Sequence, residues 1–359
     1  MSVERDDIRA AVASGLVSER QAAGLIALSD ARRGARGAIR PGEEPFELFR
    51  GFNEIFIVVG LTILASGWQG LSLALTGTVL DTGYALWSAG AAGLVWLLSE
   101  YFVRRRRMVA PAIALVLFFG AAVAGIAAGL LVRPLDVLTG GVWGDAIPVI
   151  LTTVGGLALH FARFRVPFTM APIALGLFLA AVIAIADAGN RAPDFRDLFI
   201  LGAQGGFAYA TLGLGLLFFA LAMWFDAGDR FRVGRRSANA FWLHIVAAPA
   251  IVNTVAVTLL EDPSGGHLAL LAAFLALIAA VAIVIDRRSF LVSGAGYVVI
   301  LAGLVAKGLG IALAIVSIGV ILVALGAFWE RFRAGLLRAL GSVLPLDRLP
   351  PAAGTTERF

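Results

Sequence analysis

The sequence predicts an all-α protein, a polytopic bundle of about ten transmembrane helices. Hydrophobic residues make up 60% of the 359 residues and charged residues only 15%, whereas soluble domains are typically about 45–50% apolar and about 25% charged. The apolar residues occur in long runs, and one membrane crossing needs about 20 of them. The chain therefore has room for about ten crossings with short loops, and not for a large domain outside the bilayer.

Residues 1–40 are predicted to form a small cytoplasmic helical hairpin. Acidic residues are mixed with arginines at the N-terminus and no apolar block follows directly, so the segment does not resemble a signal peptide. We expect short helices at 4–13 and 19–33, the second opened by a capping box of Ser18 and Gln21. Such a hairpin has too little core to be stable alone. It is therefore either an element that binds a protein partner or self-associates, or a solvated leader with residual helicity.

Residues 41–51 are predicted to form an interfacial elbow, and residues 52–329 the transmembrane bundle. Phe46, Leu48 and Phe49 supply side chains that such an elbow inserts at the level of the lipid headgroups. The apolar runs that follow predict crossings at 52–78, 84–103, 108–132, 146–162, 166–187, 198–225, 238–260, 268–285, 289–306 and 308–329.

The distribution of basic residues predicts that both termini face the cytoplasm. With ten alternating crossings, 25 of the 29 basic residues fall on the side of the N-terminus. The side richer in arginine and lysine is normally the cytoplasmic one. The same rule explains the net charge of +5 without a nucleic-acid partner. The four basic residues on the other side are Arg133, Arg191, Arg196 and Lys307.

Residues 330–359 are predicted to be a basic amphipathic tail. Apolar residues alternate with Arg331, Arg333 and Arg338 at helical spacing before a series of prolines ends the helix. Helices of this kind lie on anionic lipid, with an attraction of about 1 kcal/mol for each basic residue. We expect anionic lipid of the inner leaflet to be the partner of this tail, and a protein partner is the alternative.

Three Arg-Phe-Arg motifs, each closing an even-numbered helix, are consistent with duplication. An offset of 186 residues also aligns Glu100 with Asp286, each just before an arginine cluster. A parallel internal repeat of helices 1–4 and 7–10 would have these features. Arginine beside phenylalanine is also what interfacial anchoring alone produces, and we prefer that explanation. The motifs occupy residues 163–165, 230–232 and 331–333.

Polar residues within the spans are few, and they are the candidates for a substrate pathway. Asn53 and Glu54 lie in the first turn of the first span, where a helix N-terminus also favours an anion, so capping is the preferred role of Glu54 and a pathway role the alternative. His244 lies deeper in the seventh span, followed by Pro249 and Asn253. A pH-coupled site could use His244 as its titrating group, Asn253 as a ligand for a polar solute and Pro249 as a hinge.

The helical geometry of the seventh span does not favour such a site. Nine residues at about 100° each place His244 and Asn253 on opposite faces of a straight helix. They would share a cavity only if a kink at Pro249 rotated one half of the helix. A buried histidine bonded to a neighbouring helix is the structural alternative. Of the other histidines, His160 is expected at the interface and His267 in an outer loop.

Small residues at helical spacing predict close packing of helices, since lipid offers no hydrophobic drive between them. Gly125 and Gly129 form such a pair in the third span. The sixth span carries a stripe of Gly202, Gly206 and Gly213. Its polar residues Gln204 and Tyr209 are further pathway candidates, although packing is the preferred explanation.

The sequence favours no enzymatic, metal-binding or cofactor-binding activity. It contains no cysteine, which excludes disulfides, thiolate metal sites and thiol nucleophiles. It also lacks the nucleophile-elbow, zinc-protease, phosphate-loop and dinucleotide motifs. The acidic residues near the outer ends of the spans are expected to be solvated loop charges. They are Asp187, Asp194, Asp197, Glu261 and Asp262.

Three short stretches of the chain carry a family resemblance. They are Val17-Ser18-Glu19-Arg20-Gln21-Ala22-Ala23, then Ala65-Ser66-Gly67-Trp68, and then 235–244 followed by Ala247-Ala248-Pro249. They resemble uncharacterised bacterial polytopic integral-membrane proteins of the domain-of-unknown-function type. The resemblance implies a protein of the bacterial inner membrane with a cytoplasmic N-terminal helical pair, and it implies no activity.

Two functions remain open from the sequence. One is a carrier for a small or amphiphilic, lipid-like solute, which predicts a polar cavity near Glu54, His244 and Asn253. The other is a non-transporting scaffold or sensor, which predicts a dry bundle and an exposed apolar surface on residues 4–33. The lack of charge in the middle of the spans argues against a steeply ion-coupled pump. We therefore prefer a weakly coupled carrier at this point.

Overall fold

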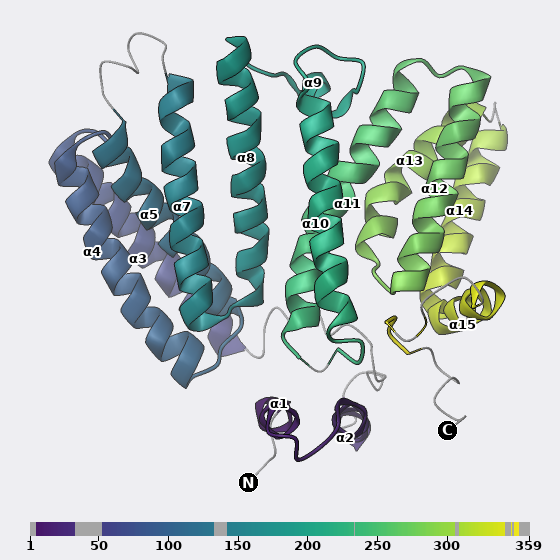
Figure 1. Ribbon diagram of the computed structural model, residues 1–359, viewed down its shortest axis with the longest axis horizontal. Helices are drawn as coiled ribbons and strands as arrows, with labels where there is room; N and C mark the ends of the chain where they lie inside the picture. Colours follow the sequence, from purple (N-terminus) through teal and green to yellow (C-terminus); the bar gives the residue numbers. More distant parts are fainter. Residues whose placement is uncertain are drawn as a thin grey trace. The chain divides into compact units, whose positions relative to one another are not determined.

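The computed structural model describes residues 5–32, 52–132, 142–232, 234–305, 309–341, 346 and 348–351. Every regular element in these residues is helical, which confirms the predicted fold class (Figure 1). The predicted elbow at 41–51 lies outside them. The chain divides into two compact units. We call residues 46–197 with 203–210 the middle unit, and residues 1–45 with 198–202 and 211–359 the terminal unit.

The middle unit is a row of antiparallel helices that pack in chain order. Helix α4 packs on α5, α5 on α7 and α7 on α8, while α3 packs on both α4 and α5. The last turn of α4 continues as the π-helix η1, and a short 3-10 turn η2 leads into α8. The elements are α3 (Phe52–Thr76), α4 (Thr82–Ser99), η1 (Glu100–Arg105), α5 (Ala110–Leu131), α7 (Val142–Phe164), η2 (Pro167–Thr169) and α8 (Met170–Gly189), followed by α9 (Phe195–Phe199).

The terminal unit combines the N-terminal helical pair with the second half of the chain. Its core is formed mainly by buried aliphatic residues of α11 and α12 with Phe290 of α13, and Leu337 and Leu349 near the C-terminus join it. The elements are α1 (Arg5–Ala13), α2 (Glu19–Arg32), α10 (Phe207–Ala227), α11 (Arg236–Glu261), α12 (Gly265–Ile285), α13 (Ser289–Val305), α14 (Leu309–Ala327) and α15 (Trp329–Leu340).

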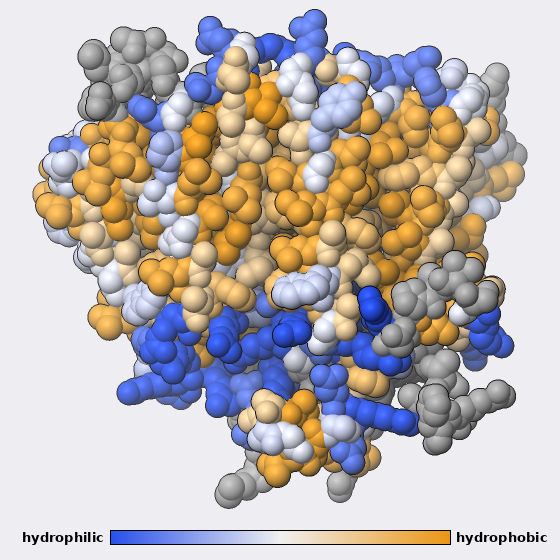
Figure 2. Space-filling view, in the orientation of Figure 1, coloured by the Kyte–Doolittle hydropathy of each residue, from blue (hydrophilic) through white to orange (hydrophobic). Residues whose placement is uncertain are grey.

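The helices have the length and surface of membrane-spanning segments. In the described residues, 8 helices are long and apolar enough to cross a membrane, or 9 if the bent pair α14–α15 counts as one span. Helix α13 is apolar but shorter, with 17 residues. Large apolar side chains cover the outside of the helices along most of their length (Figure 2). Such surfaces require lipid, so this is a multi-pass membrane protein.

The sixth predicted crossing differs from the observed helix. The sequence predicts one helix over 198–225, but α9 ends at Phe199 and α10 begins at Phe207. Gly205 and Gly206 have φ values of 94° and 74°, a backbone conformation that breaks a right-handed helix. The prediction of a glycine stripe running through this helix was therefore wrong, because Gly202 and Gly206 precede it. Hydropathy did not reveal the break, since the residues around it are apolar or small.

The predicted glycine pair on α5 does allow close packing. A Cβ atom at Gly125 would lie 2.4 Å from Ser88 Oγ on α4, and one at Gly129 would lie 2.5 Å from the carbonyl oxygen of Asp81. In the terminal unit the equivalent role belongs to Gly215, where a Cβ atom would lie 2.9 Å from Ala250 Cβ. Within each unit, two helices approach this closely because glycine has no side chain and leaves room for atoms of the neighbouring helix.

Both ends of the chain contain short helices outside the long spans. Ser18 and Gln21 form the predicted capping box at the start of α2: the Ser18 N–H donates to Gln21 Oε1 at 2.9 Å, and the Gln21 N–H donates to Ser18 Oγ at 3.2 Å. Helix α15 is amphipathic, but its buried face contains Arg333 together with Trp329 and Leu337. The expectation that Arg333 contacts lipid was therefore wrong, because α15 packs this face on α12 and α14.

We predict that Gly129→Ala destabilises the protein. The new methyl group would meet backbone that cannot rotate away, and overpacking of this kind costs about 1–3 kcal/mol. The measurement is the free energy of unfolding from an SDS titration in mixed micelles. Gly93→Ala on α4 is the control, since no atom lies within 4 Å of its new Cβ. Equal stabilities for the two variants would refute the close α4–α5 contact.

Candidate functional site

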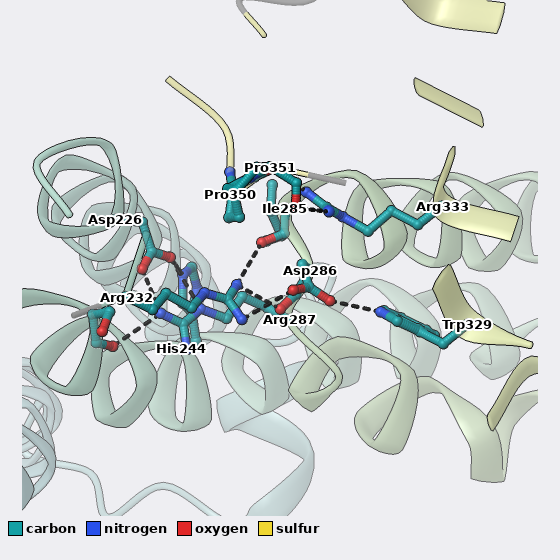
Figure 3. Close-up of polar contacts among 11 residues, drawn as sticks. Asp226, Arg232, His244, Ile285, Asp286, Arg287, Trp329, Arg333, Pro350 and Pro351 are labelled. Atoms are coloured by element: carbon teal, nitrogen blue, oxygen red, sulfur yellow. Dashed lines mark hydrogen bonds and ion pairs between the residues drawn. The ribbon is translucent and has the colours of Figure 1, made fainter. Parts of the chain in front are cut away.

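A heavily buried polar cluster lies where α10, α11 and α12 come together (Figure 3). Asp226 is in the last turn of α10, His244 is in the third turn of α11, and Arg287 follows the end of α12. Arg287 Nε donates to Asp226 Oδ2 at 3.0 Å, and Arg287 Nη2 donates to Asp226 Oδ1. His244 Nε2 lies 3.0 Å from Asp226 Oδ2. We call these three residues the Asp226 cluster.

The Asp226 cluster is closed to solvent. His244 is 0% exposed, Arg287 1% and Asp226 5%. The bidentate geometry between guanidinium and carboxylate is the strongest form of ion pair, and Arg287 Nη2 also donates to the carbonyl oxygen of Ser237 at 2.9 Å. Good geometry and further hydrogen bonds are what stabilise an ion pair at this depth; within the cluster, His244 Nδ1 is buried without a hydrogen-bond partner among the described residues. The arrangement therefore holds three helix ends together.

A second set of polar contacts lies beside it and centres on Asp286 (Figure 3). Asp286 Oδ2 is 3.0 Å from Arg232 Nη1, and Asp286 Oδ1 accepts a hydrogen bond from Trp329 Nε1 at 2.6 Å. Arg232 Nη2 also donates to the carbonyl oxygens of Ile285 at 3.2 Å and Asp286 at 2.8 Å. These bonds satisfy carbonyl groups that the end of α12 leaves without a helical partner.

The loop between α10 and α11 is fixed by a carboxylate of its own. Asp229 Oδ1 accepts from the N–H of Gly234, and Asp229 Oδ2 accepts from the N–H of Ser237, both at 3.1 Å. Asp229 is buried, with 4% exposure. It thus caps the N-terminus of α11, where a negative charge is also favoured by the helix dipole.

Phe231, in the same loop, contacts the N-terminal helical pair. Ala22 and Ala23 of α2 are buried, and they form a small apolar cluster with partly buried residues of α1 and α2 and with Phe231. Phe231 is the central residue of the second Arg-Phe-Arg motif. The residue that follows it is Arg232 of the Asp286 contacts. The helical pair is therefore seated on the bundle of the terminal unit through this loop.

The structure gives the two pathway candidates on α11 different partners. His244 contacts Asp226, while Asn253 Oδ1 accepts from the hydroxyl group of Tyr297 on α13 at 3.0 Å. Helix α11 continues without interruption through Pro249. The two side chains therefore do not converge on one polar cavity.

The remaining pathway candidates belong to the middle unit. Glu54 is 4% exposed and accepts hydrogen bonds from the N–H groups of Val109 at 3.4 Å and Ala110 at 3.1 Å. It thus caps the N-terminus of α5, not only that of its own helix. The other three, Asn53, Gln204 and Tyr209, are exposed.

Sequence reasoning missed several residues of the buried network. Asp226 and Arg287 were not singled out, although an aspartate in the last turn of an apolar helix would have been a usable indication.

His160 was expected at the interface but is 0% exposed. Its Nε2 lies 3.2 Å from Ser99 Oγ, and the rings of Phe119 and Phe164 lie 5.0 and 4.5 Å away. Packing of α7 against α4 and α5 buries it.

Comparison of the chain with family models, with curated proteins and with solved structures finds no match to any of them.

We predict that Asp226 and Arg287 are coupled energetically. Asp226→Leu or Arg287→Met alone leaves an uncompensated buried charge and should lower the free energy of unfolding by about 3–5 kcal/mol. The double variant removes both charges and should lose less than the sum of the two. The measurement is a double-mutant cycle by SDS titration. Arg288→Met is the matched control, because Arg288 is exposed; additive losses would contradict the pairing.

We also predict that Asp197 remains ionised in mild acid. The Asp194 N–H group donates to its carboxylate at 3.0 Å, and so does Arg191 Nη2 at 2.6 Å. These bonds lower the pKa of Asp197 despite the opposing effect of its burial. Because the folded pKa is lower than the unfolded one, these contacts stabilise the loop above the usual titration range of aspartate, about 3.9. Their contribution is lost as the pH falls through the folded pKa.

A carboxyl carbon NMR titration in nanodiscs measures this shift directly. The midpoint for Asp197 should lie below the ordinary value. In an Arg191→Met variant the midpoint should move upward, because one of the donors is gone. A midpoint at or above the ordinary value in the unmodified protein would contradict the prediction.

Proposed function

We propose that this protein is a non-transporting membrane scaffold or sensor that acts through the helical pair α1–α2. The observation that carries the proposal is the contact of Phe231 with the buried Ala22 and Ala23. A solvated leader would not need a specific contact with the bundle. A docked pair, in contrast, presents its outer surface in a defined position.

The outer surface of the pair supports a binding role. Leu16 is 80% exposed, Leu25 48% and Leu28 57%. These leucines do not lie on the long apolar helices that lipid would cover. Exposed apolar side chains grouped on a small folded element are typical of protein interaction sites. The occupant we propose is a protein partner, with a second copy of the chain as the alternative.

The polar candidates for a transport pathway support the same proposal. His244 is held by Asp226, Asn253 by Tyr297, and Glu54 by the backbone of α5. Side chains that are committed to structural partners must lose those contacts before they can bind a solute, at the cost of an unpaired buried group. The carrier for an amphiphilic solute therefore stays a prediction and is not the function that we favour.

We further propose that the protein resides in the inner membrane of a bacterium with both termini in the cytoplasm. The bias of basic residues toward one side of the spans supports this orientation. It would place α1–α2, the α10–α11 loop and α15 on the cytoplasmic side. The resemblance to uncharacterised bacterial membrane proteins supports the same location.

The proposed function predicts that charge on the exposed leucines abolishes partner binding. Leu25→Asp and Leu28→Asp should insert into the membrane normally, because neither residue lies in a long span. Each should lose the proteins that co-purify with the unmodified chain after crosslinking in native membranes. Ser14→Asp is the control, since Ser14 is an exposed polar residue in the turn between α1 and α2, and it should retain them.

Two results would count against the proposal. One is an unchanged set of crosslinked proteins in both leucine variants. The other is movement of a short-chain fluorescent phospholipid between leaflets of proteoliposomes that exceeds protein-free vesicles and loses its pH dependence in His244→Gln. That second result would favour the carrier.

A further inference from the structure

The contacts around Asp286 join both ends of the chain. Asp286 ends α12 with a φ of 57°, and Arg232 in the α10–α11 loop has a φ of 53°. Residues other than glycine rarely adopt this conformation, and they keep it only where surrounding contacts impose it. Backbone hydrogen bonds hold both conformations, from the Asp286 N–H to Ile283 and from the Arg232 N–H to Asp229. The ion pair between Arg232 and Asp286, at 3.0 Å, links the two residues directly.

On one side of Asp286 the contacts lead to the N-terminal pair. Arg232 follows Phe231 in the chain, so the bonds that join Arg232 to the end of α12 hold the backbone next to Phe231 in place. Phe231 in turn packs with Ala22 and Ala23 of α2. If the ion pair between Arg232 and Asp286 breaks, Arg232 keeps its bonds to the carbonyl oxygens of Ile285 and Asp286, but the loop that carries Phe231 is held by fewer contacts. The packing of α1–α2 against Phe231 then changes.

On the other side the contacts lead to the C-terminal segment. Trp329, which donates to Asp286, is the first residue of α15, and Arg333 lies one turn further along the same buried face. Arg333 donates to the carbonyl oxygens of Pro350 at 2.6 Å and Pro351 at 3.1 Å. Leu349 is 6% exposed and packs in the core of the terminal unit. Residues 348–351 are thus bound to α15 as a strap (Figure 3).

We propose that residues 348–351 and Asp286 regulate the docking of α1–α2. With the strap in place, α15 holds Trp329 against Asp286, Asp286 holds Arg232, and Phe231 keeps the helical pair seated. Displacement of the strap loosens α15 and shifts the pair toward a released state. Coupling of this kind needs an element with two arrangements that both sites influence. We assign this role to the segment with Phe231 and Arg232, because it contacts both α2 and Asp286. The inference rests on the proposed function, because it names the regulation of the same binding element.

The test measures the position of the helical pair and needs no partner. The chain has no cysteine, so two spin labels can be placed at Gly24→Cys on α2 and Ala227→Cys at the end of α10, both exposed positions. Double electron-electron resonance in nanodiscs then reports the distance between them. The full chain should give one narrow distance distribution.

Two truncations form the central comparison. A chain that ends at Asp347 lacks the strap, and its distance distribution should broaden and lose the docked peak. A chain that ends at Pro351 keeps the strap and should match the full chain. Arg333→Met should act like the first truncation, and Arg331→Met, an exposed arginine of the same helix, should act like the second.

Substitutions at Asp286 and Trp329 test the series of contacts that leads from the strap to Phe231. Asp286→Asn removes the charge that holds Arg232, and it should broaden the distribution in the full chain. In the chain ending at Asp347 it should add little, because the two changes interrupt the same series of contacts. Trp329→Phe removes the indole N–H bond and keeps a smaller aromatic ring in its place, so it tests the link where Asp286→Asn impairs folding. It should give an intermediate distribution.

Some outcomes would overturn the inference. An unchanged distribution after truncation at Asp347 would do so, and so would fully additive effects of truncation and Asp286→Asn. Failure of the proposed function is distinguishable. In that case the spin-label distances would respond as described, while the leucine variants of α2 would keep all crosslinked proteins.

Discussion

A charge buried within a membrane protein must be paired or hydrogen-bonded, and this constraint determines how the helices of the terminal unit meet. Removing an isolated charge from water costs several kcal/mol even after relaxation of the protein. Asp226 therefore requires Arg287 and His244, and Asp286 requires Arg232. Each pair joins segments that are distant in sequence. The requirement for pairing thus becomes a requirement that the C-terminal ends of α10 and α12 lie beside the first turns of α11.

The same side chains also satisfy the ends of the helices. Four N–H groups and four carbonyl groups at the two ends of a helix have no helical partner. Arg232 bonds to carbonyl groups at the end of α12, and Asp229 bonds to N–H groups at the start of α11. Glu54 performs this function for α5 in the middle unit. Several charged residues next to the spans therefore satisfy helix ends, in addition to their effect on the orientation of the protein in the membrane.

These structural roles bear on what the protein does. His244, Asn253 and Glu54, which looked like a solute pathway, are bonded to neighbouring helices, and α1–α2 exposes Leu16, Leu25 and Leu28 outside the long spans. The loop on which this pair sits is the loop that carries Arg232. A binding element placed on a network of buried ion pairs can respond to changes in that network, as a scaffold or sensor requires.

The sequence alone was sufficient for the fold class and most of the helices, because a segment in lipid must satisfy its own backbone and bury about 20 apolar residues for each crossing. It also predicted the capping box of Ser18 and Gln21, whose partners are three residues apart. It did not predict the pairing of Arg287 with Asp226, 61 residues away, or the inward direction of Arg333. Those depend on the rotation of each helix about its axis, which hydropathy does not encode. Only the packing of the helices against one another decides which charged side chains face each other and which face lipid or water.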